Sequence, residues 1–383
     1  MAGIYLHIPF CKQACTYCNF HFTTSLRYKD ELVEAMVKEI SLQKSFVEAE
    51  PIATIYFGGG TPSLLGIDDC RLIMEALKEN FDILPEAEIT LEANPDDISQ
   101  ERLQAWKSIG INRLSIGVQS FFEEDLKWMN RAHNAELAVN SLQLAVKEFD
   151  NLSMDLIYGS PLLTDDMWRQ NVDRAVDYGI THLSCYALTV EEKTPLHKQI
   201  LSNKKMNVDS DRQAHQFLLL MQWLKEKGFE HYEVSNFAKP GFRSKHNSSY
   251  WRGEKYLGLG PSAHSYNGRI RKWNVANNIR YINAISKGII EGETETLTPL
   301  QQLNEYIMIS LRTKEGMDVA KMESNWGKER IAAIEKRLSF FERQGLLTIT
   351  GSTVQLTETG ILRADGIAAD LFSPGPLSPG GGT

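Results

Sequence analysis

Three cysteines near the amino end of the sequence are the residues whose type and spacing most clearly suggest chemistry. Cys11, Cys15 and Cys18 are spaced C-x3-C-x2-C within HIPFCKQACTYCNFHF, and Phe20 stands where a fourth cysteine of the run could sit. An odd total of five cysteines in a chain of 383 residues argues against a disulfide framework. Clustered thiols then favour metal or redox chemistry, and the expected location is the reducing cytoplasm.

The spacing alone leaves three interpretations open. His21 could complete a structural Cys3His zinc site, or the cysteines could be unligated structural residues. Structural zinc sites usually draw their ligands from two separated knuckles, whereas all of these candidates lie in one short loop. An iron–sulfur cluster normally takes four thiolates. Three thiolates would leave one iron open, and that iron can chelate a small molecule through amine and carboxylate groups. Cys70 and Cys185, by contrast, are expected to be small buried apolar residues.

The elements that must position this loop are the strands of a parallel sheet. Short β-rich runs alternate with segments of helical periodicity, such as 29–46 and the stretch between Ser99, a candidate N-cap, and Gly110. Each strand is followed by a helix, which predicts an α/β fold with a partial (β/α)6 TIM-like barrel. Chemistry in such barrels lies at the carboxyl ends of the strands. The six expected strands are 3–8, 53–57, 88–92, 112–116, 152–158 and 181–188.

Polar residues lie at the ends of several of these strands. The glycines of GGGTP, 58–62, would let the backbone approach a ligand, although a tight turn explains them equally well. Glu92 and Gln119 lie at expected strand mouths, and Arg131 carries a guanidinium suited to a carboxylate. Asp155 lies inside an otherwise apolar strand, where a charge is costly unless it is paired or bound to a ligand.

Together these features resemble the radical S-adenosylmethionine (SAM) enzymes. In that family C-x3-C-x2-C follows the first barrel strand, with an aromatic residue, here Tyr17, before the last cysteine. The resemblance implies a [4Fe-4S] cluster held by Cys11, Cys15 and Cys18, with SAM on the fourth iron, where an electron from the cluster cleaves it. The SAM site that the resemblance implies comprises Tyr5, Gly60, Thr61, Glu92, Gln119, Arg131 and Asp155.

A narrower resemblance covers about residues 3–370. HIPFC, GGGTP, EANP, GVQSF and DLIYG together resemble the oxygen-independent coproporphyrinogen III oxidase family. The true oxidases carry a further cysteine two residues after the third, where this chain has Phe20. Cys18-Asn19-Phe20 is more similar to the haem chaperones of the HemW type, which bind haem and pass it to acceptor proteins. The resemblance therefore implies a haem chaperone, with the oxidase as the alternative.

The stretch HNSSYW, 246–251, matches the H-N-x-x-Y-W motif of the chaperone group. The match makes His246 the candidate axial haem ligand, with Tyr250 and Trp251 as rings that would pack against a porphyrin. A loop histidine beside two half-buried rings is the alternative. Three other histidines compete for the role: His7, His21 and His264.

The rest of the chain divides into a connecting segment and a C-terminal module. The segment 231–298 is rich in Gly, Asn, Ser and Tyr, and we expect it to be mostly loops. Helical patterns at 300–312 and 328–344 precede two alternating strands over 346–357, which predicts a winged-helix-like α+β domain. The expected division is 1–230, the barrel; 231–298, the connecting segment with the HNxxYW motif; 299–372, the C-terminal domain; and 373–383, a disordered Gly- and Pro-rich tail.

The composition limits the kinds of partner that this chain can be expected to bind. The net charge is -8, and residues 300–383 hold nine Lys or Arg against ten Asp or Glu, so no basic face is available for a nucleic acid. No apolar run approaches the ~20 residues of a membrane helix, and the first residues lack the basic region of a signal peptide. We therefore expect no transmembrane segment and leave peripheral membrane contact open. The other expected partners are unidentified haem-accepting proteins and an electron donor for the cluster.

Overall fold

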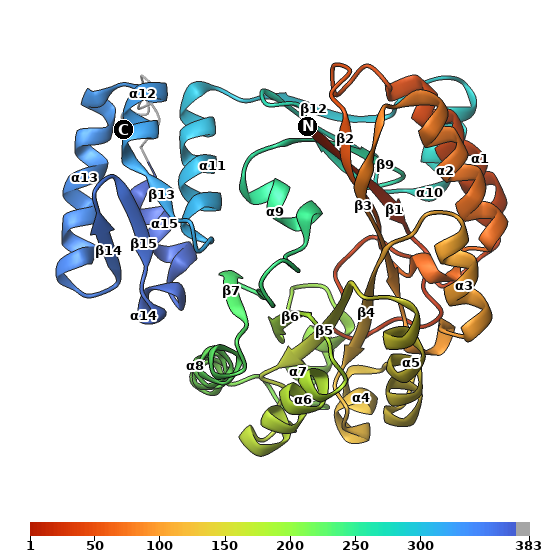
Figure 1. Cartoon of the computed structure of the whole chain (residues 1–383), viewed down its shortest axis with the longest axis horizontal. Coiled ribbons are helices and arrows are strands. Elements are labelled where there is room, and N and C mark those ends of the chain that lie inside the picture. The colour runs from red at the N-terminus through yellow and green to blue at the C-terminus, as the bar shows by residue number, and fades with distance from the viewer. Residues whose placement is uncertain (373–383) are drawn as a thin grey trace.

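The fold is known from a computed structural model that describes residues 1–372. A parallel sheet runs through the amino-terminal half, with its strands paired in chain order and each pair parallel. This arrangement confirms the predicted α/β fold, and its curvature is compatible with a partial TIM-like barrel (Figure 1). The strands are β1 (Ala2–Ile8), β2 (Ile52–Gly59), β3 (Ile83–Ala93), β4 (Arg113–Gln119), β5 (Leu152–Tyr158) and β6 (His182–Ala187).

Helices cover the convex side of this sheet and leave its concave side open to other elements (Figure 1). The helix that begins after Ser99 ends at Ser108, and the Ser99 side chain accepts a hydrogen bond from the Arg102 backbone amide, as its N-cap role requires. The helices are α1 (Lys29–Gln43), α2 (Ile67–Asn80), α3 (Gln100–Ser108), α4 (Glu123–Met129), α5 (Ala135–Glu148), α6 (Asp165–Asp177), α7 (Pro195–Leu201) and α8 (Ser210–Glu226), with short 3-10 turns η1 (Pro62–Leu64) and η2 (Pro95–Asp97).

Residue alternation along the strands separates an apolar face from a polar one. Ile4, Leu6 and Ile8 of β1 are fully buried in the main hydrophobic core, whereas Tyr5 lines a cavity on the concave side. The same alternation recurs in β4, where Leu114 belongs to the core, and in the strands that flank it. The concave face is consequently lined by polar side chains, which is where a ligand of this barrel would bind.

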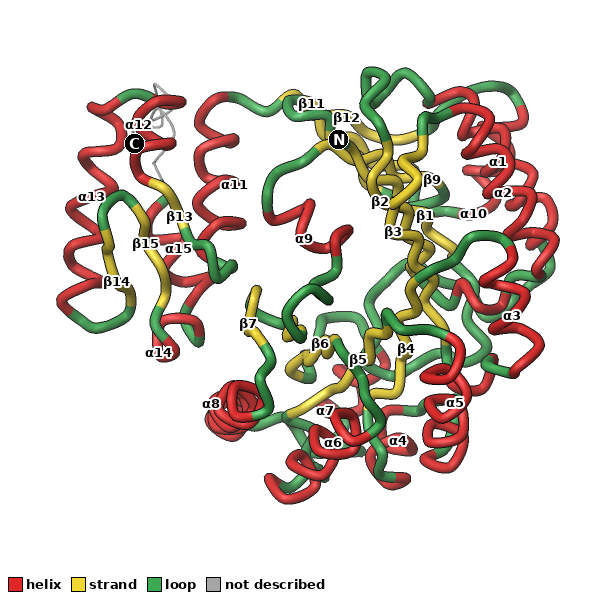
Figure 2. The backbone as a smooth tube through the Cα atoms, viewed as in Figure 1, coloured by secondary structure: helices red, strands yellow, loops and turns green. Residues whose placement is uncertain are grey.

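The prediction of loops over 231–298 was wrong, because much of this segment forms strands that extend the sheet on both sides. β9 pairs parallel to β1, and β8 pairs antiparallel to β6, giving a sheet of twelve strands within the described residues (Figure 2). These strands are only three to five residues long. The elements are β7 (Glu230–Glu233), β8 (Asn236–Ala238), α9 (Lys245–Trp251), β9 (Lys255–Leu259), β10 (His264–Tyr266), β11 (Ile270–Asn274), α10 (Asn278–Ser286) and β12 (Gly292–Thr296).

A winged-helix-like unit follows, with a hydrophobic core of its own. Its helices α11 (Pro299–Leu311) and α13 (Lys328–Arg343) match the predicted 300–312 and 328–344, and the hairpin of β14 (Leu347–Thr350) and β15 (Thr353–Leu356) matches the predicted turn. The boundaries between the predicted units stay a prediction, and the tail 373–383 lies outside the described residues. The other elements are β13 (Met317–Asp318), α12 (Val319–Trp326), α14 (Glu358–Ile361) and α15 (Ala364–Leu371).

Glu39 of α1 fastens the added strands to the barrel. Its side chain is fully buried, and its carboxylate accepts hydrogen bonds from Tyr281 Oη at 2.6 Å, Asn274 Nδ2 at 2.6 Å, Gly260 N at 2.8 Å and Gln43 Nε2 at 2.6 Å. The donors come from α1, α10, β11 and the turn after β9. One carboxylate therefore links four segments of the sequence.

We expect Glu39→Ala to lower the free energy of unfolding by about 3 kcal/mol, since it leaves several buried donors without an acceptor. Urea denaturation followed by circular dichroism measures the change. Glu34→Ala is the matched control, because Glu34 is exposed on the same helix. Equal midpoints for the two variants would contradict this structural role.

Candidate functional site

The cysteine loop lies between β1 and α1 and is held at several points. The Cys11 amide donates to Thr23 O at 2.9 Å, and the Thr16 amide donates to Met129 O at 3.2 Å, which ties the loop to the end of α4. All three thiols are free and half-buried. Burial raises the pKa of Cys11 to about 11 and also raises that of Cys18. Without a metal, Cys11 and Cys18 are therefore neutral thiols at pH 7.

Arg131 connects the cysteine loop to two further strand ends. Its Nη1 donates to Cys15 Sγ at 3.3 Å, and its Nη2 donates to Asn94 Oδ1 at 2.8 Å and to Gly117 O at 2.9 Å. Its Nε is buried and has no hydrogen-bond partner. A guanidinium with an unused donor beside three thiols is a strong candidate to bind an anionic group of a ligand.

The GGGTP segment packs directly against the first part of the cysteine loop. The Gly60 amide donates to Ile8 O at 2.8 Å, and the Thr61 amide donates to Phe10 O at 2.6 Å. A Cβ atom at Gly60 would come within 2.7 Å of Phe10 O, so glycine is required for this close approach. Asn94 Nδ2 donates to Thr61 Oγ1 at 3.2 Å, which joins this segment to the Arg131 network.

Two predicted carboxylates lie on the concave side with their own donors. Tyr56 Oη donates to Glu92 Oε1 at 2.7 Å, and Ser115 Oγ donates to Asp155 Oδ1 at 3.3 Å. Burial raises the pKa of Glu92 to about 7 and that of Asp155 to about 6. Both groups would gain from a cation placed between the strand ends, because a positive charge favours their ionised form.

Gln119 and Tyr5 complete the predicted set. Gln119 ends β4 with a left-handed backbone, φ 68°, at an irregularity in the pairing with β5. The Gln119 and Arg131 side chains both lie beside Gly117. Tyr5 lies farther along the concave face, with its hydroxyl 3.2 Å from His7 Nδ1. The structure therefore brings Gly60, Thr61, Gln119 and Arg131 together beside the cysteine loop, whereas Tyr5 lines the cavity farther along the concave face.

The donor set favours a cluster over a single zinc ion. Within residues 1–372 no three His, Cys, Asp or Glu side chains converge closely enough to hold one metal ion. His21, the fourth ligand of the zinc interpretation, has Nε2 at 2.7 Å from Asn278 Oδ1. A cubane presents its iron atoms at separate corners, so its thiolates need not converge on one point. Three free thiols in a half-buried loop fit such a cluster.

His246 is enclosed more tightly than the sequence suggested. It is 2% exposed; its Nδ1 is 2.7 Å from Thr54 Oγ1 and its Nε2 is 2.9 Å from Tyr250 Oη. Its ring stacks on Tyr56 with centroids 5.0 Å apart. Burial lowers the pKa of His246 to about 3, so the ring is neutral at pH 7. Both nitrogens are engaged, and a metal could reach Nε2 only after Tyr250 moves away.

The competing histidines lie at the carboxyl end of β1 and on β10. His7 is buried, with Nε2 2.9 Å from His21 O, and its ring centroid lies 6.1 Å from that of His21. His264 is exposed and stacks on Trp273 with centroids 5.9 Å apart.

Phe20, the residue that separates the resemblance to the oxidases from the resemblance to the chaperones, is 67% exposed on the cysteine loop. The predicted burial of Cys70 and Cys185 is confirmed.

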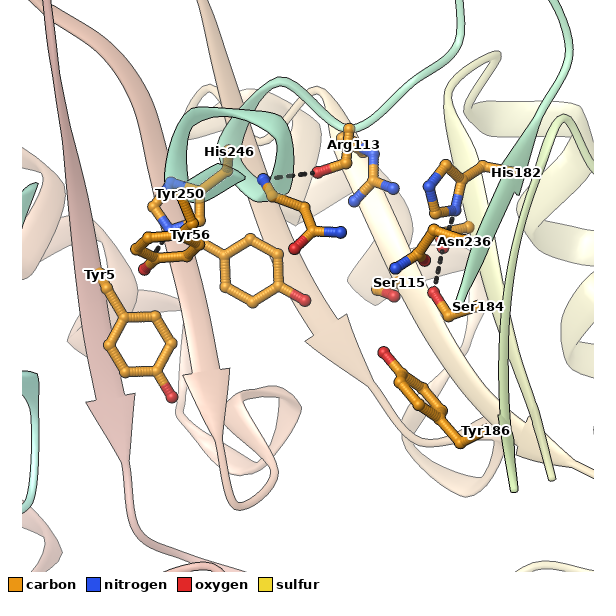
Figure 3. A pocket seen from close by; sticks show the side chains of 13 residues that line it. Tyr5, Tyr56, Arg113, Ser115, His182, Ser184, Tyr186, Asn236, His246 and Tyr250 are labelled. Carbon is orange, nitrogen blue, oxygen red and sulfur yellow. Dashed lines mark hydrogen bonds between the residues drawn. The ribbon is translucent and has the colours of Figure 1, made fainter. Parts of the chain in front are cut away.

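A polar cavity of about 200 Å³ occupies the concave side between α9 and the sheet (Figure 3). Figure 3 shows Tyr5, Tyr56 and Tyr250 on one wall, Ser115, Ser184 and Tyr186 on the other, and Arg113 at the top between them. The sequence analysis missed this cavity, although the alternation Arg113, Ser115, Gly117 along one strand carried a signal for it. The remaining lining residues are Ser153, His182, Asn236, Ser244, His246 and Asn247.

Comparisons with known proteins identify the family of this chain. Residues 5–175 match the Radical SAM superfamily model, and residues 297–363 match the HemN C-terminal domain. Fold and cysteine loop thus define a radical SAM protein. Similar relatives are the heme chaperones HemW of Mycobacterium tuberculosis, 33% identical over 97% of this chain and 94% of theirs, and of Bacillus subtilis, 32% identical over 94% and 97%. The chain belongs to the family of these HemW proteins.

A solved structure supports the fold. Coproporphyrinogen III oxidase (HemN) from Escherichia coli superposes with a TM-score of 0.85 at 23% identity, over 97% of this chain and 90% of that one. Because the sequence identity is low, this similarity shows a shared fold only. Among residues 1–372 no helix is both long and apolar enough to cross a membrane.

We expect Arg131→Gln to loosen the cysteine loop, because it removes the guanidinium that joins Cys15, Asn94 and Gly117. Hydrogen exchange followed by mass spectrometry should show faster exchange of the amides of 9–28, by roughly tenfold for the loss of about 1.4 kcal/mol of local stability. Arg71→Gln, on the outer surface of α2, is the control. Unchanged exchange in 9–28 would show that the loop does not depend on Arg131.

Proposed function

We propose that this chain is a haem chaperone: it holds a [4Fe-4S] cluster on Cys11, Cys15 and Cys18, binds SAM beside it, and delivers haem to acceptor proteins. The observation that carries the proposal is Arg131, whose guanidinium bonds Cys15 and keeps a free Nε donor at the mouth of the strands. Full-length similarity to proteins named heme chaperone HemW supports the choice of haem as cargo.

The residues around the loop suit the two charged ends of SAM. Arg131 would pair with the carboxylate through its unused Nε donor, because a hydrogen bond between a guanidinium and a carboxylate is assisted by their charges. Glu92 and Asp155 carry the complementary negative charge for its amine and sulfonium, and binding of that cation would lower their raised pKa values. Gly60 and Thr61 would keep the ligand close to the backbone, and Gln119 and Tyr5 would bound it on either side. The cluster, when bound, would supply the electron for SAM cleavage.

The second candidate function is oxygen-independent coproporphyrinogen III oxidation. The shared fold with the Escherichia coli oxidase favours it, but a likeness of fold at this identity says nothing of the reaction. Phe20 occupies the position of the further cysteine of the oxidases, and a phenyl ring cannot act as a thiol. We therefore keep the chaperone as the function and the oxidase as the alternative.

For the haem iron we propose His246 as axial ligand. Thr54 Oγ1 is hydrogen-bonded to His246 Nδ1 and fixes the orientation of the ring, as the hydrogen-bond partners of metal-binding histidines do. The neutral ring that burial imposes is the form that binds iron. Nε2 becomes available when the Tyr250 hydroxyl turns away.

Partners follow from the same proposal. Haem acceptor proteins and an electron donor for the cluster are required by the chemistry, and no feature of the described residues identifies either. The free thiols suit a reducing compartment, and we propose the cytoplasm.

Cys15→Ala tests the cluster. After anaerobic reconstitution we expect the wild-type chain to hold about four iron atoms with broad iron–sulfur absorption, and the variant to hold roughly none, since only two thiolates remain. Iron counting and absorption spectra measure this, together with 5′-deoxyadenosine formation. Cys70→Ala, a buried thiol on α2, should behave as the wild type. Full iron content in Cys15→Ala would overturn the ligand assignment.

A pair of substitutions tests His246. We expect His246→Ala to weaken haem binding by at least about tenfold, and Tyr250→Phe to strengthen it by about threefold to tenfold, because Phe removes the hydroxyl that competes for Nε2. Titration of haem followed at the Soret band measures both. His197→Ala is the control. Wild-type affinity in both variants would exclude His246 and direct attention to His264.

A further inference from the structure

Arg113 at the start of β4 is a buried cation that the proposed function does not use. Its side chain is 2% exposed and lines the cavity of Figure 3. Its Nε has no hydrogen-bond partner. Among the described residues its one ion pair is with Glu88, with Nε and Oε2 3.9 Å apart. This separation is too long for a hydrogen bond, so the guanidinium is buried with its donors largely unused.

Glu88 is already engaged by the beginning of α9. Its carboxylate accepts hydrogen bonds from the backbone amides of His246, at 3.0 Å, and Lys245, at 3.1 Å, and from Ser244 Oγ at 3.4 Å. These bonds hold the HNSSYW helix in place. Its negative charge therefore compensates the unpaired amides of a helix as well as Arg113.

The other charged groups that face Arg113 come from neighbouring strands. Asp155 on β5 and Glu92 on β3 accept hydrogen bonds from Ser115 and Tyr56, and burial raises the pKa of both carboxyls. The neutral rings of His182 and His246 complete the surroundings, and Arg113 contributes to the lowered pKa of each. Among the described residues that line this cavity there is no second cation, so Arg113 is its centre of positive charge.

The size and the opening of the cavity limit what it can hold. About 200 Å³ is smaller than the pockets that enclose whole drug-sized ligands, and it suits a short side chain or a small molecule. Tyr186, which lines the cavity, is 45% exposed. The wall opposite Tyr5, Tyr56 and Tyr250 in Figure 3 adds hydroxyl groups near Arg113, from Ser115, Ser184 and Tyr186.

We propose that this cavity is a carboxylate-binding site in which the guanidinium of Arg113 binds the carboxylate of the ligand. A planar guanidinium offers two parallel N–H donors to such a group. The carboxylate has two chemical sources: the propionate side chain of haem, which rests on the proposed function, or a free small monocarboxylate. The cavity takes the carboxylate and its short chain, whereas binding of the haem iron to His246, on the same lining, also requires Tyr250 to move away.

Haem and haem dimethyl ester distinguish the sources, because the ester keeps the macrocycle and iron but masks both propionates. The full-length chain is titrated with each in the same solvent and followed at the Soret band. Sodium propionate and propionamide are titrated separately by calorimetry. The variants are Arg113→Gln and Arg113→Lys, with Arg280→Gln, an exposed arginine, as the control. Thermal melts of each variant show whether it folds.

If Arg113 binds a haem propionate, haem binds the wild type about tenfold to a hundredfold more tightly than its ester does. Arg113→Gln removes that preference, Arg113→Lys keeps part of it, and Arg280→Gln keeps all of it. If the source is a free carboxylate, propionate binds, propionamide does not, and Arg113→Gln abolishes the binding, whether or not haem binds at all. The second result sustains the site even where the haem proposal fails.

Equal affinity of the wild type for haem and for its ester, together with no binding of propionate, would overturn the proposal. This comparison needs only the wild-type chain, so it holds even if Arg113→Gln fails to fold. Loss of the preference for haem over its ester in Arg280→Gln would also overturn it, because the effect would then be one of general charge.

Discussion

The polar lining of the concave face is the constraint on which the rest of this structure depends. Alternation along the strands buries residues such as Leu6 and Leu114 on the helix side and turns the intervening residues inward. Buried polar groups are costly unless they are hydrogen-bonded or bound to a ligand. Most inward groups here find partners within the chain. Arg113 and Arg131 each keep a buried Nε without a partner, so two cations within the barrel have a donor that a ligand could use.

The helix α9 shows how this constraint shapes the HNSSYW segment. Its first residues are held by Glu88 and its histidine by Thr54, both from strands of the barrel. Its last residue, Trp251, lies under the guanidinium of Arg312, 5.5 Å from the ring centroid, where the C-terminal unit begins. One short helix thus contacts the barrel and the C-terminal unit. Movement of Tyr250 or of α9 would change contacts with both the barrel and the C-terminal unit. This arrangement suits a protein that must both hold and release a ligand.

The sequence predicted what local patterns encode and missed what depends on distant partners. Six strands and the cysteine loop were predicted correctly, because alternation, turn residues and thiol spacing are local signals. The strands β9 to β12 were missed because they are short and are specified by the edge of β1 and by Glu39, more than 200 residues away. The enclosure of His246 was missed because Thr54 lies 192 residues earlier in the chain. The role of Arg113 is invisible without the cavity.

The charges inside the barrel follow an order that a single ligand does not explain. Arg131 lies at the strand mouths beside the thiols, and Arg113 lies at the start of its strand, on the opposite side of Asp155 along the strand direction. Both guanidiniums act to lower the pKa of Asp155, although burial prevails and raises it. From the strand mouths inward, the positive Arg131, the acidic Asp155 and the positive Arg113 therefore follow one another. The carboxylate and the amine of SAM, bound at the strand mouths, would use Arg131 and Asp155. Arg113, the deeper cation, is then left for the carboxylate of a different molecule.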